Sequence, residues 1–263
     1  MATKPIITVV FLLVLGWPTV NLAAMEPLPK LRGGVPPHSV IGNVMTTNQQ
    51  ALGDVDPTAA GLALEEAPHL IWLADPDPRL RPAMVWDSQQ GGIYSVRTLG
   101  NQLATAAAAL DYGIHQLHAP ILLITGNTDN DAIRLFQKEY GHLAEATRRA
   151  LNHLHPALSH LQLADKEARD ERAAAKQQLR AVEANVDYQV KRAMERYRQR
   201  VETGRLVVVG AVVDLANTYG TGAGRLLLIN LNGETDPQQL KSSSHLVRVP
   251  PSMRDYLGRR SIP

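Results

Sequence analysis

The sequence Ile-Leu-Leu-Ile-Thr-Gly-Asn-Thr-Asp-Asn-Asp-Ala occupies residues 121–132, and the rest of the chain is organised around it. Its first four residues are apolar without polar alternation, which is typical of a strand buried on both faces of a parallel sheet. Gly126 permits a sharp turn, and the polar residues from Asn127 to Asn130 are types that cap the start of a helix. In open α/β sheets, the loop between such a strand and the following helix usually carries the chemistry. We therefore expect the functional site here.

Segments on both sides of this stretch give an alternating pattern of strands and helices. Buried strands without helical periodicity are predicted at residues 69–73, 92–96, 206–213 and 225–231. Helices are predicted at residues 58–66 and 102–117 and, with a break at Pro156, across residues 140–202. The last two strands are separated by residues 214–224, which contain three glycines, and are interpreted as a hairpin. The predicted fold class is therefore α/β, with a central parallel sheet that ends in an antiparallel C-terminal strand and is flanked by helices.

Composition excludes several classes of function. The 263 residues are 44% hydrophobic, which is enough for one sizeable core, and the formal charge is only +2. No aromatic-rich basic block accompanies this charge, so nucleic acid is not an expected partner. The chain has no cysteine, which excludes disulfides, thiolate zinc sites and thiol nucleophiles.

The N-terminus has the pattern of an export signal. Lys4 precedes an apolar run at residues 6–17, and the small residues Ala23 and Ala24 follow it. We interpret residues 1–24 as a signal peptide, with an uncleaved membrane anchor as the alternative. The expected location is the periplasm, a thylakoid lumen or the extracellular side. Residues 25–57 are rich in proline and glycine and are predicted to form a linker or arm, residues 58–233 the folded domain, and residues 234–263 a polar, poorly ordered C-terminal tail.

Four sequence blocks between residues 68 and 233 resemble the β-class carbonic anhydrases. Residues 75–79, Asp-Pro-Asp-Pro-Arg, resemble the Cys-x-Asp-x-Arg turn of that family, and residues 97–101, Arg-Thr-Leu-Gly-Asn, resemble its Arg-x-x-Gly-Asn motif. Residues 126–132, Gly-Asn-Thr-Asp-Asn-Asp-Ala, resemble Gly-His-Thr-x-Cys-Gly-Ala. Residues 185–190, followed by 204–215, resemble the helix, strand and Asp-Leu turn that close the family fold. Each block is short, but their order and spacing support one another.

The resemblance implies reversible hydration of carbon dioxide by a zinc-bound hydroxide. The family holds its zinc with two cysteines and a histidine, and the matching positions here are Asp75, Asn127 and Asn130. One carboxylate with two neutral amides is a poor zinc site, so we expect neither zinc nor the hydroxide nucleophile. Asp77 and Arg79 match a salt-bridged catalytic dyad of the family. Without a metal beside it, we expect this retained pair to be structural.

Two other groups of residues could hold a metal ion. Oxygen-bearing side chains that should converge at one sheet edge would suit calcium or magnesium: Asp75, Asp77, Asp129 and Asp131, with Asn127 and Asn130. The favoured interpretation is instead that Asp129 and Asp131 cap the following helix, where its dipole favours negative charge. The histidines 153, 155 and 160, and the pair 115 and 118, lack a recognised ligand spacing. The glycines at 220, 222 and 224 precede a strand and are interpreted as a turn rather than a nucleotide loop.

These inferences predict an exported, carbonic-anhydrase-like protein without zinc-dependent activity that acts as a binding or scaffolding subunit. Family members are dimers or larger, with N-terminal arms over the neighbouring subunit, so the resemblance implies a homodimer or higher oligomer. Export also suggests a partner in a membrane complex. The alternative is an active carbonate dehydratase, or an enzyme that binds bicarbonate or another small anion near Arg79 or Arg97, with a metal site unlike that of the family.

Overall fold

A computed structural model describes residues 37–52, 68–86, 92–161 and 171–260. The chain divides into two units, Met1–Val55 and Asp56–Pro263. In the first unit, the predicted linker contains a helix that the prediction lacked, α1 (Pro37–Leu52). The predicted signal and the helix expected at residues 58–66 lie outside the described residues. No helix in the described ranges combines the length and apolar character needed to span a bilayer.

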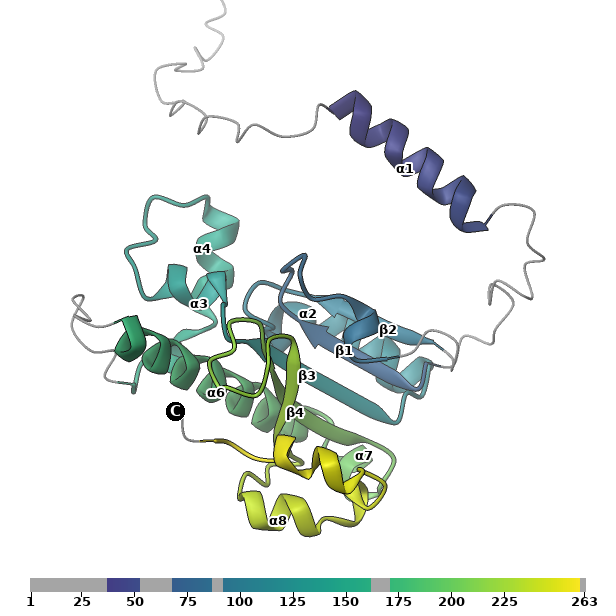
Figure 1. The fold of residues 1–263 in the computed structure, drawn as a ribbon, viewed down its shortest axis with the longest axis vertical. Helices are drawn as coiled ribbons and strands as arrows, with labels where there is room; N and C mark the ends of the chain where they lie inside the picture. The colour runs from purple at the N-terminus through teal and green to yellow at the C-terminus, as the bar shows by residue number, and fades with distance from the viewer. Residues whose placement is uncertain (1–36, 53–67, 87–91, 162–170, 261–263) are drawn as a thin grey trace, which may run out of the picture. The chain divides into compact units, whose positions relative to one another are not determined.

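The strands of the second unit form one sheet in the part of the chain that the structure describes, in the order β2-β1-β3-β4-β5 (Figure 1). The strands are β1 (Leu70–Ala74), β2 (Ile93–Arg97), β3 (Ile121–Asn127), β4 (Val207–Asp214) and β5 (Arg225–Leu231). β2, β1, β3 and β4 are parallel neighbours, whereas β5 pairs with β4 in the antiparallel direction. The predicted fold class is confirmed.

Helices and short turns connect and flank these strands. They are η2 (Pro82–Met84), α2 (Leu103–Asp111), the π-helical turn η4 (Tyr112–Gln116), α3 (Asp131–Phe136), α4 (Glu145–Asn152), α5 (His155–Leu158), α6 (Glu171–Arg196), α7 (Arg198–Glu202), α8 (Pro237–Ser242), η5 (Ser244–Leu246) and η6 (Pro251–Tyr256). The helical region predicted at residues 140–202 therefore comprises α4 to α7. Pro156 lies in the first turn of α5, where backbone N–H groups have no acceptor within the helix, so its lack of an N–H costs no helical hydrogen bond.

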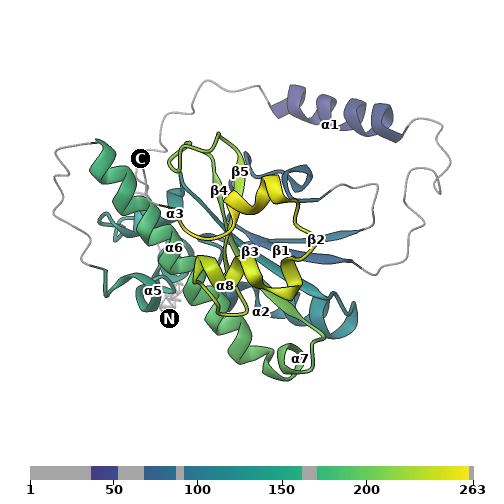
Figure 2. The ribbon, with the colours of Figure 1, turned by 60° about the horizontal axis from the view of Figure 1, so that its bottom comes forward.

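The long helix α6 lies against β3 and β4 (Figure 2). Its side of this contact includes the buried valines at 182, 186 and 190. This packing explains why the turn predicted at Gly126 is wrong, since β3 continues through Gly126 to Asn127. A Cβ atom at Gly126 would lie 2.6 Å from Val182 Cγ1, and one at Gly210 in β4 would lie 2.8 Å from Val186 Cγ1. Both glycines allow the helix to approach the sheet closely.

A smaller apolar cluster contains buried side chains from β1, β3 and β4 that are separate from the α6 cluster. Its fully buried members include Trp72 and Ala74 of β1 and Ala211 of β4. Leu80 joins it from the loop after β1, and Met84 of η2 packs against it. This cluster fixes the loop that carries Asp75, Asp77 and Arg79, because that loop is anchored at both of its ends by buried apolar residues.

The prediction of a poorly ordered tail from residue 234 is wrong for the described residues up to 260. Asp236 caps α8 by accepting hydrogen bonds from the N–H groups of Gln238 and Gln239, both at 2.9 Å. Leu240 is buried, and Leu257 bridges to Leu228 of β5. The mean composition of the tail is polar, but two well-spaced leucines are enough to anchor it to the sheet.

Candidate functional site

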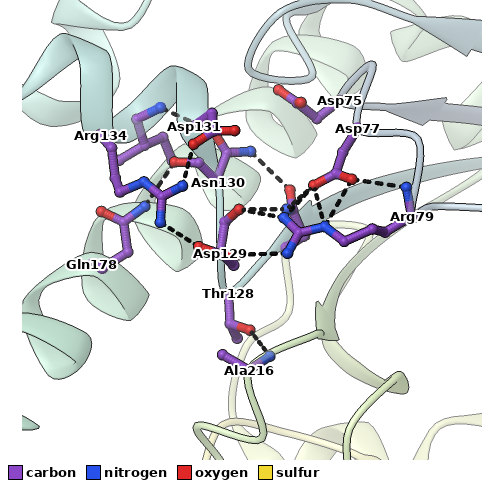
Figure 3. A network of polar contacts seen from close by, with 12 residues as sticks. Asp75, Asp77, Arg79, Thr128, Asp129, Asn130, Asp131, Arg134, Gln178 and Ala216 are labelled. Carbon is purple, nitrogen blue, oxygen red and sulfur yellow. Dashed lines mark hydrogen bonds and ion pairs between the residues drawn. The ribbon is translucent and has the colours of Figure 1, made fainter. Parts of the chain in front are cut away.

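The site lies where the carboxyl ends of β1 and β3 meet. The two strands are parallel neighbours with Ala74 opposite Thr125. Asp75 therefore follows β1 close to Asn127, the last residue of β3. Asn130 is the N-cap of α3, a few residues farther along. The structure thus places together the side chains that the sequence predicted to converge (Figure 3).

The side chains at the three zinc-ligand positions are buried, and they are engaged by hydrogen bonds. Asn130 Nδ2 donates to Asn127 Oδ1 at 2.9 Å, while Asn130 Oδ1 accepts from the backbone N–H of Ile133 at 2.9 Å. Asp75 Oδ2 accepts from the backbone N–H of Gly100 at 2.7 Å. Asp75 is 4% exposed, and both asparagines are 0% exposed. Both amide oxygens therefore already accept a hydrogen bond from the protein.

The amide nitrogen of Asn127 joins this cluster to the neighbouring charged residues. Asn127 Nδ2 donates to the backbone oxygen of Asp129 at 3.1 Å and to Asp77 Oδ2 at 3.3 Å. Asn127 thus connects the β1 loop with the β3–α3 loop. We call the hydrogen-bonded set Asp75, Asn127 and Asn130 the amide network.

Burial raises the pKa of the Asp75 carboxyl above its ordinary value. Hydrogen bonding from the Gly100 backbone and from the Asn130 side chain opposes this rise, and the negative charges of Asp77 and Asp131 add to it. The rise shows that desolvation outweighs the hydrogen bonds that favour the anion. The ionised form of Asp75 is therefore less favourable in the folded protein than in water.

Asp77 and Arg79 form the predicted salt bridge, but a third group takes part. Arg79 Nη2 lies 2.6 Å from Asp77 Oδ2, and Arg79 Nη1 lies 2.5 Å from Asp129 Oδ2. Hydrogen bonds from Arg79 hold the pKa of the Asp77 carboxyl below its usual range, and the bonds to Asp77 and Asp129 raise the pKa of Arg79. The Arg79 side chain is 47% exposed, so its charge faces solvent at the edge of the site.

The expectation that Asp129 and Asp131 cap the helix is wrong, because Asn130 provides the cap. Asp129 instead bridges Arg79 and Arg134, and Asp131 pairs with Arg134. Asp131 does lie in the first turn of α3, where the helix dipole favours its charge. Consecutive capping-type residues made the choice of cap ambiguous in the sequence.

Asp214, which sequence reasoning noted only as part of a turn, supports the site from β4. Its carboxylate accepts hydrogen bonds from Thr128 Oγ1 at 3.1 Å, from the N–H of Thr218 at 2.7 Å and from the N–H of Tyr219 at 2.9 Å. The Thr128 hydroxyl oxygen accepts from the N–H of Ala216 at 3.0 Å. An aspartate directly after a run of apolar strand residues was the available signal for this role.

Arg97, near which the sequence suggested that an anion could bind, makes structural contacts at the site. It donates to the backbone oxygens of Asp75 at 3.0 Å and Leu80 at 2.6 Å, and its guanidinium lies 4.4 Å from the centre of the Trp72 ring. Burial lowers the pKa of Arg97. Arg97 thus holds the β1 loop through its backbone and stacks on the sheet beneath it.

The remaining sequence features do not form a metal site in the described ranges, where no three His, Cys, Asp or Glu side chains could share an ion. His155 Nε2 lies 2.9 Å from the Tyr140 hydroxyl, and Arg200 Nε lies 3.3 Å from His115 Nδ1. The glycines at 220, 222 and 224 all have positive φ angles, which confirms the predicted turn.

The residues at this site do not fit zinc. Zinc in proteins is held by thiolate, imidazole or carboxylate groups, and Asp75 is the one such group among the three positions. The oxygens of Asn127 and Asn130 are directed at hydrogen-bond donors of the protein. The nearby carboxylates of Asp77 and Asp129 are neutralised by arginines. The arrangement joins the two loops through hydrogen bonds and ion pairs.

Comparison with known proteins places this geometry in context. The family model described as carbonic anhydrase matches residues 70–221. No curated protein matches the chain. Among solved structures, it is similar to a tetrameric β-carbonic anhydrase from Sordaria macrospora, with 17% identity, a TM-score of 0.56, and coverage of 73% of this chain and 95% of that one. It is also similar to the Coccomyxa β-carbonic anhydrase in complex with acetazolamide, with 18% identity, a TM-score of 0.56, and coverage of 80% and 92%.

The structural likeness, at these identities, bears on the fold alone. The sheet with its antiparallel last strand is the arrangement found in those structures. The family match covers more than half of the chain. It includes residues 75–79 and 126–132, which form the two loops of the site. The chain belongs to the β-class carbonic anhydrase family.

Proposed function

We propose that this protein is a carbonic-anhydrase-family member without zinc-dependent carbon dioxide hydration, which acts as a binding or scaffolding subunit. The observation that carries the proposal is the amide network. Each of its asparagine oxygens accepts a hydrogen bond from the protein, at 2.9 Å in both cases. Hydration by the family mechanism needs a firmly held cation to lower the pKa of bound water to about 7.

The rest of the proposed role concerns assembly and location. One of the similar solved structures is described as tetrameric, which supports an oligomer here, with a homodimer as its smallest form. The sequence pattern of residues 1–24 supports export to the periplasm, a thylakoid lumen or the extracellular side. An exported oligomer without catalytic metal would be suited to a place in a membrane complex.

A second candidate keeps enzyme activity or binding of a small anion such as bicarbonate. It is favoured by the retained Asp77–Arg79 pair, which stands beside the amide network, and by the half-exposed guanidinium of Arg79. The ion pair between Arg79 and Asp129, at 2.5 Å, argues against this candidate. An anion would have to compete with the carboxylates of Asp77 and Asp129 for the same guanidinium.

The decisive test is stopped-flow measurement of carbon dioxide hydration together with elemental analysis of the purified chain. The proposal expects a rate indistinguishable from buffer and less than stoichiometric zinc. Hydration at enzyme rates with one zinc per subunit would overturn it. As a positive control, the triple variant Asp75→Cys, Asn127→His, Asn130→Cys restores the family ligands and is expected to retain zinc after dialysis.

The scaffolding role has its own test. Sedimentation velocity and affinity capture of the chain from its native membrane fraction measure self-association and partners separately. A stable monomer that captures the same proteins as an unrelated bait would contradict this role, even if hydration is absent.

A further inference from the structure

A cavity of about 530 Å³ lies between α2 and α6, and no residue of the amide network lines it. Its wall combines apolar groups with polar ones, among them Leu103, Ala107, Pro156, Gln102, Tyr188 and Arg192. Sites for small molecules in proteins are typically cavities of about 300–1,000 Å³ with an apolar wall and a few polar groups. The size and the lining of this cavity are therefore those of a site for a small organic molecule.

Gln102 gives the wall of the cavity a buried hydrogen-bond donor without an acceptor. The residue is 1% exposed, and its Oε1 accepts from Gln189 Nε2 at 2.9 Å. Gln189 Oε1 accepts from the N–H of Leu103 at 3.0 Å, which fixes the orientation of the Gln189 amide and, through it, that of the Gln102 amide. Gln102 Nε2 is left without a partner among the described residues. Since buried donors in proteins are nearly always paired, this atom indicates an acceptor that the chain does not supply.

The N-terminus of α2 adds backbone donors beside this amide. No side chain caps this helix of nine residues. Leu103 donates to Gln189, but in the described ranges no acceptor outside the helix contacts the N–H groups of Ala104 and Thr105. The first N–H groups of a helix have no acceptor within it, and the helix dipole gives them partial positive charge. The start of α2 therefore favours an anion next to the unpaired Gln102 amide.

The helix α6 adds two further donor groups to the lining. Arg192 donates through Nη1 to Glu195 at 2.9 Å, and its other nitrogens have no partner in the described part of the chain. The Tyr188 hydroxyl has no partner there either. The side chains of Arg192 and Glu195 are 54% and 40% exposed, and exposed pairs contribute little to stability, so Arg192 can turn to a ligand at small cost. Arg196, also in the lining, is held by Asp111.

We propose that this cavity binds the carboxylate of a small organic acid at Gln102 and the start of α2, with the apolar part of the molecule against Leu103 and Ala107. A carboxylate offers two oxygens that accept and no donor, which matches the unpaired donors of the wall. One arginine with free nitrogens suits a monoanion better than a phosphate dianion. This inference goes beyond the proposed function and does not depend on whether the protein hydrates carbon dioxide.

The test measures the binding of benzoate to the full chain by calorimetry, with benzamide and acetate as matched probes. Benzamide keeps the ring without the charge, and acetate keeps the charge without the ring. We expect saturable benzoate binding with a Kd of about 1 mM or below, and binding at least about tenfold weaker for the other two probes. Equal binding of benzamide would overturn the carboxylate, and equal binding of acetate would overturn the role of the apolar wall. Without saturable benzoate binding, the site itself is refuted.

Three single variants assign the binding to this cavity. Gln102→Met keeps the length of the side chain without its amide, and Arg192→Gln removes the guanidinium. Each should weaken benzoate binding about tenfold, as expected for the loss of one hydrogen bond to a charged group. Lys191→Gln is the matched control, because it removes a positive charge from a neighbouring residue that does not line the cavity, and it should bind like the parent. If circular dichroism shows that Gln102→Met does not fold, the exposed Arg192→Gln decides the case.

The variant Arg79→Gln separates this cavity from an anion site at the β1 loop. Benzoate binding that survives Arg79→Gln and weakens in Arg192→Gln supports the cavity. Binding that weakens only in Arg79→Gln, or equally in Arg192→Gln and Lys191→Gln, would overturn it. In nuclear magnetic resonance spectra of the labelled parent, the backbone amide signals of Ala104 and Thr105 should shift as benzoate saturates, and unchanged signals would refute binding at the start of α2. None of these measurements uses hydration activity, so their failure leaves the proposed function as it stands.

Discussion

Replacing Asn130 tests whether the amide network stabilises the fold. In Asn130→Ala, the N–H of Ile133 loses its capping oxygen, and the buried Asn127 Oδ1 loses its donor. The variant also removes the side chain that favours the ionised form of Asp75. The Asn130 side chain therefore caps α3, donates a hydrogen bond to the Asn127 amide and favours the ionised form of the buried Asp75.

The expected loss follows from these separate contributions. Removal of an asparagine N-cap costs about 1 kcal/mol. Leaving the buried Asn127 oxygen without a donor costs about 1–3 kcal/mol more. We therefore expect Asn130→Ala to lower the free energy of unfolding by about 2–4 kcal/mol.

Two further variants separate these contributions, with urea unfolding followed by circular dichroism as the assay. Asp236→Ala removes the exposed N-cap of α8, which accepts from Gln238 and Gln239 at 2.9 Å and serves no buried amide, so its cost should stay near 1 kcal/mol. Asn130→Ser keeps a capping oxygen but cannot donate as the amide does, so it should retain a cost of about 1–3 kcal/mol. If Asn130→Ala costs no more than Asp236→Ala, the network does not act as a unit and the reasoning fails.

Three other changes test the packing and the charges of the site. Gly126→Ala places a methyl group 2.6 Å from a side-chain atom of α6 and should cost about 1–3 kcal/mol in urea unfolding, whereas Gly141→Ala, with nothing within 4 Å, should be neutral. Burial raises the pKa of Asp75 above its unfolded value of 3.8, so the folded state holds this proton more tightly; its stabilising effect is complete below that value and is lost as pH rises through the folded pKa. The free energy of unfolding of Asp75→Asn, relative to the parent, should therefore improve from acid to neutral pH. The measurement is urea unfolding of both proteins at a series of pH values, and a difference that does not change with pH would contradict this. Trp72→Phe leaves the buried hydroxyl of Thr125 without its 2.9 Å donor and should lower the free energy of unfolding by about 1–3 kcal/mol, measured by thermal and urea unfolding.

The sheet could be predicted from sequence because its strands carry strong local signals. The predicted strand at residues 225–231 agrees with β5, and that at 206–213 is displaced by one residue from β4. Antiparallel pairing of these two strands followed from the glycine-containing turn between them, which indicated a hairpin. Such features depend on neighbouring residues, which the sequence displays directly.

The sequence-based predictions were wrong where the conformation of a residue depends on contacts with an element distant in the sequence. Gly126 is a common turn residue, and its place inside β3 depends on Val182 of α6, which lies far along the chain. The ordered structure of the C-terminal residues depends on Leu257, which forms a bridge with Leu228 of β5, a strand that lies earlier in the chain. The choice of Asn130 over Asp129 as helix cap depends on Arg79 and Arg134, which attract the aspartate away.

The chemistry of the amide network explains how a loop that matches the metal-binding loop of the family can stay folded when the family's ligand residues are replaced. An amide both donates and accepts, so Asn127 and Asn130 can satisfy each other, whereas a thiol and an imidazole in the same places would need a cation to bring them together. The buried Asp75 is held in turn by the N–H of Gly100. It follows that restoring one family ligand alone breaks the network without building a metal site, and should destabilise the protein. Only the three changes made together, with zinc present, can exchange one stable arrangement for the other.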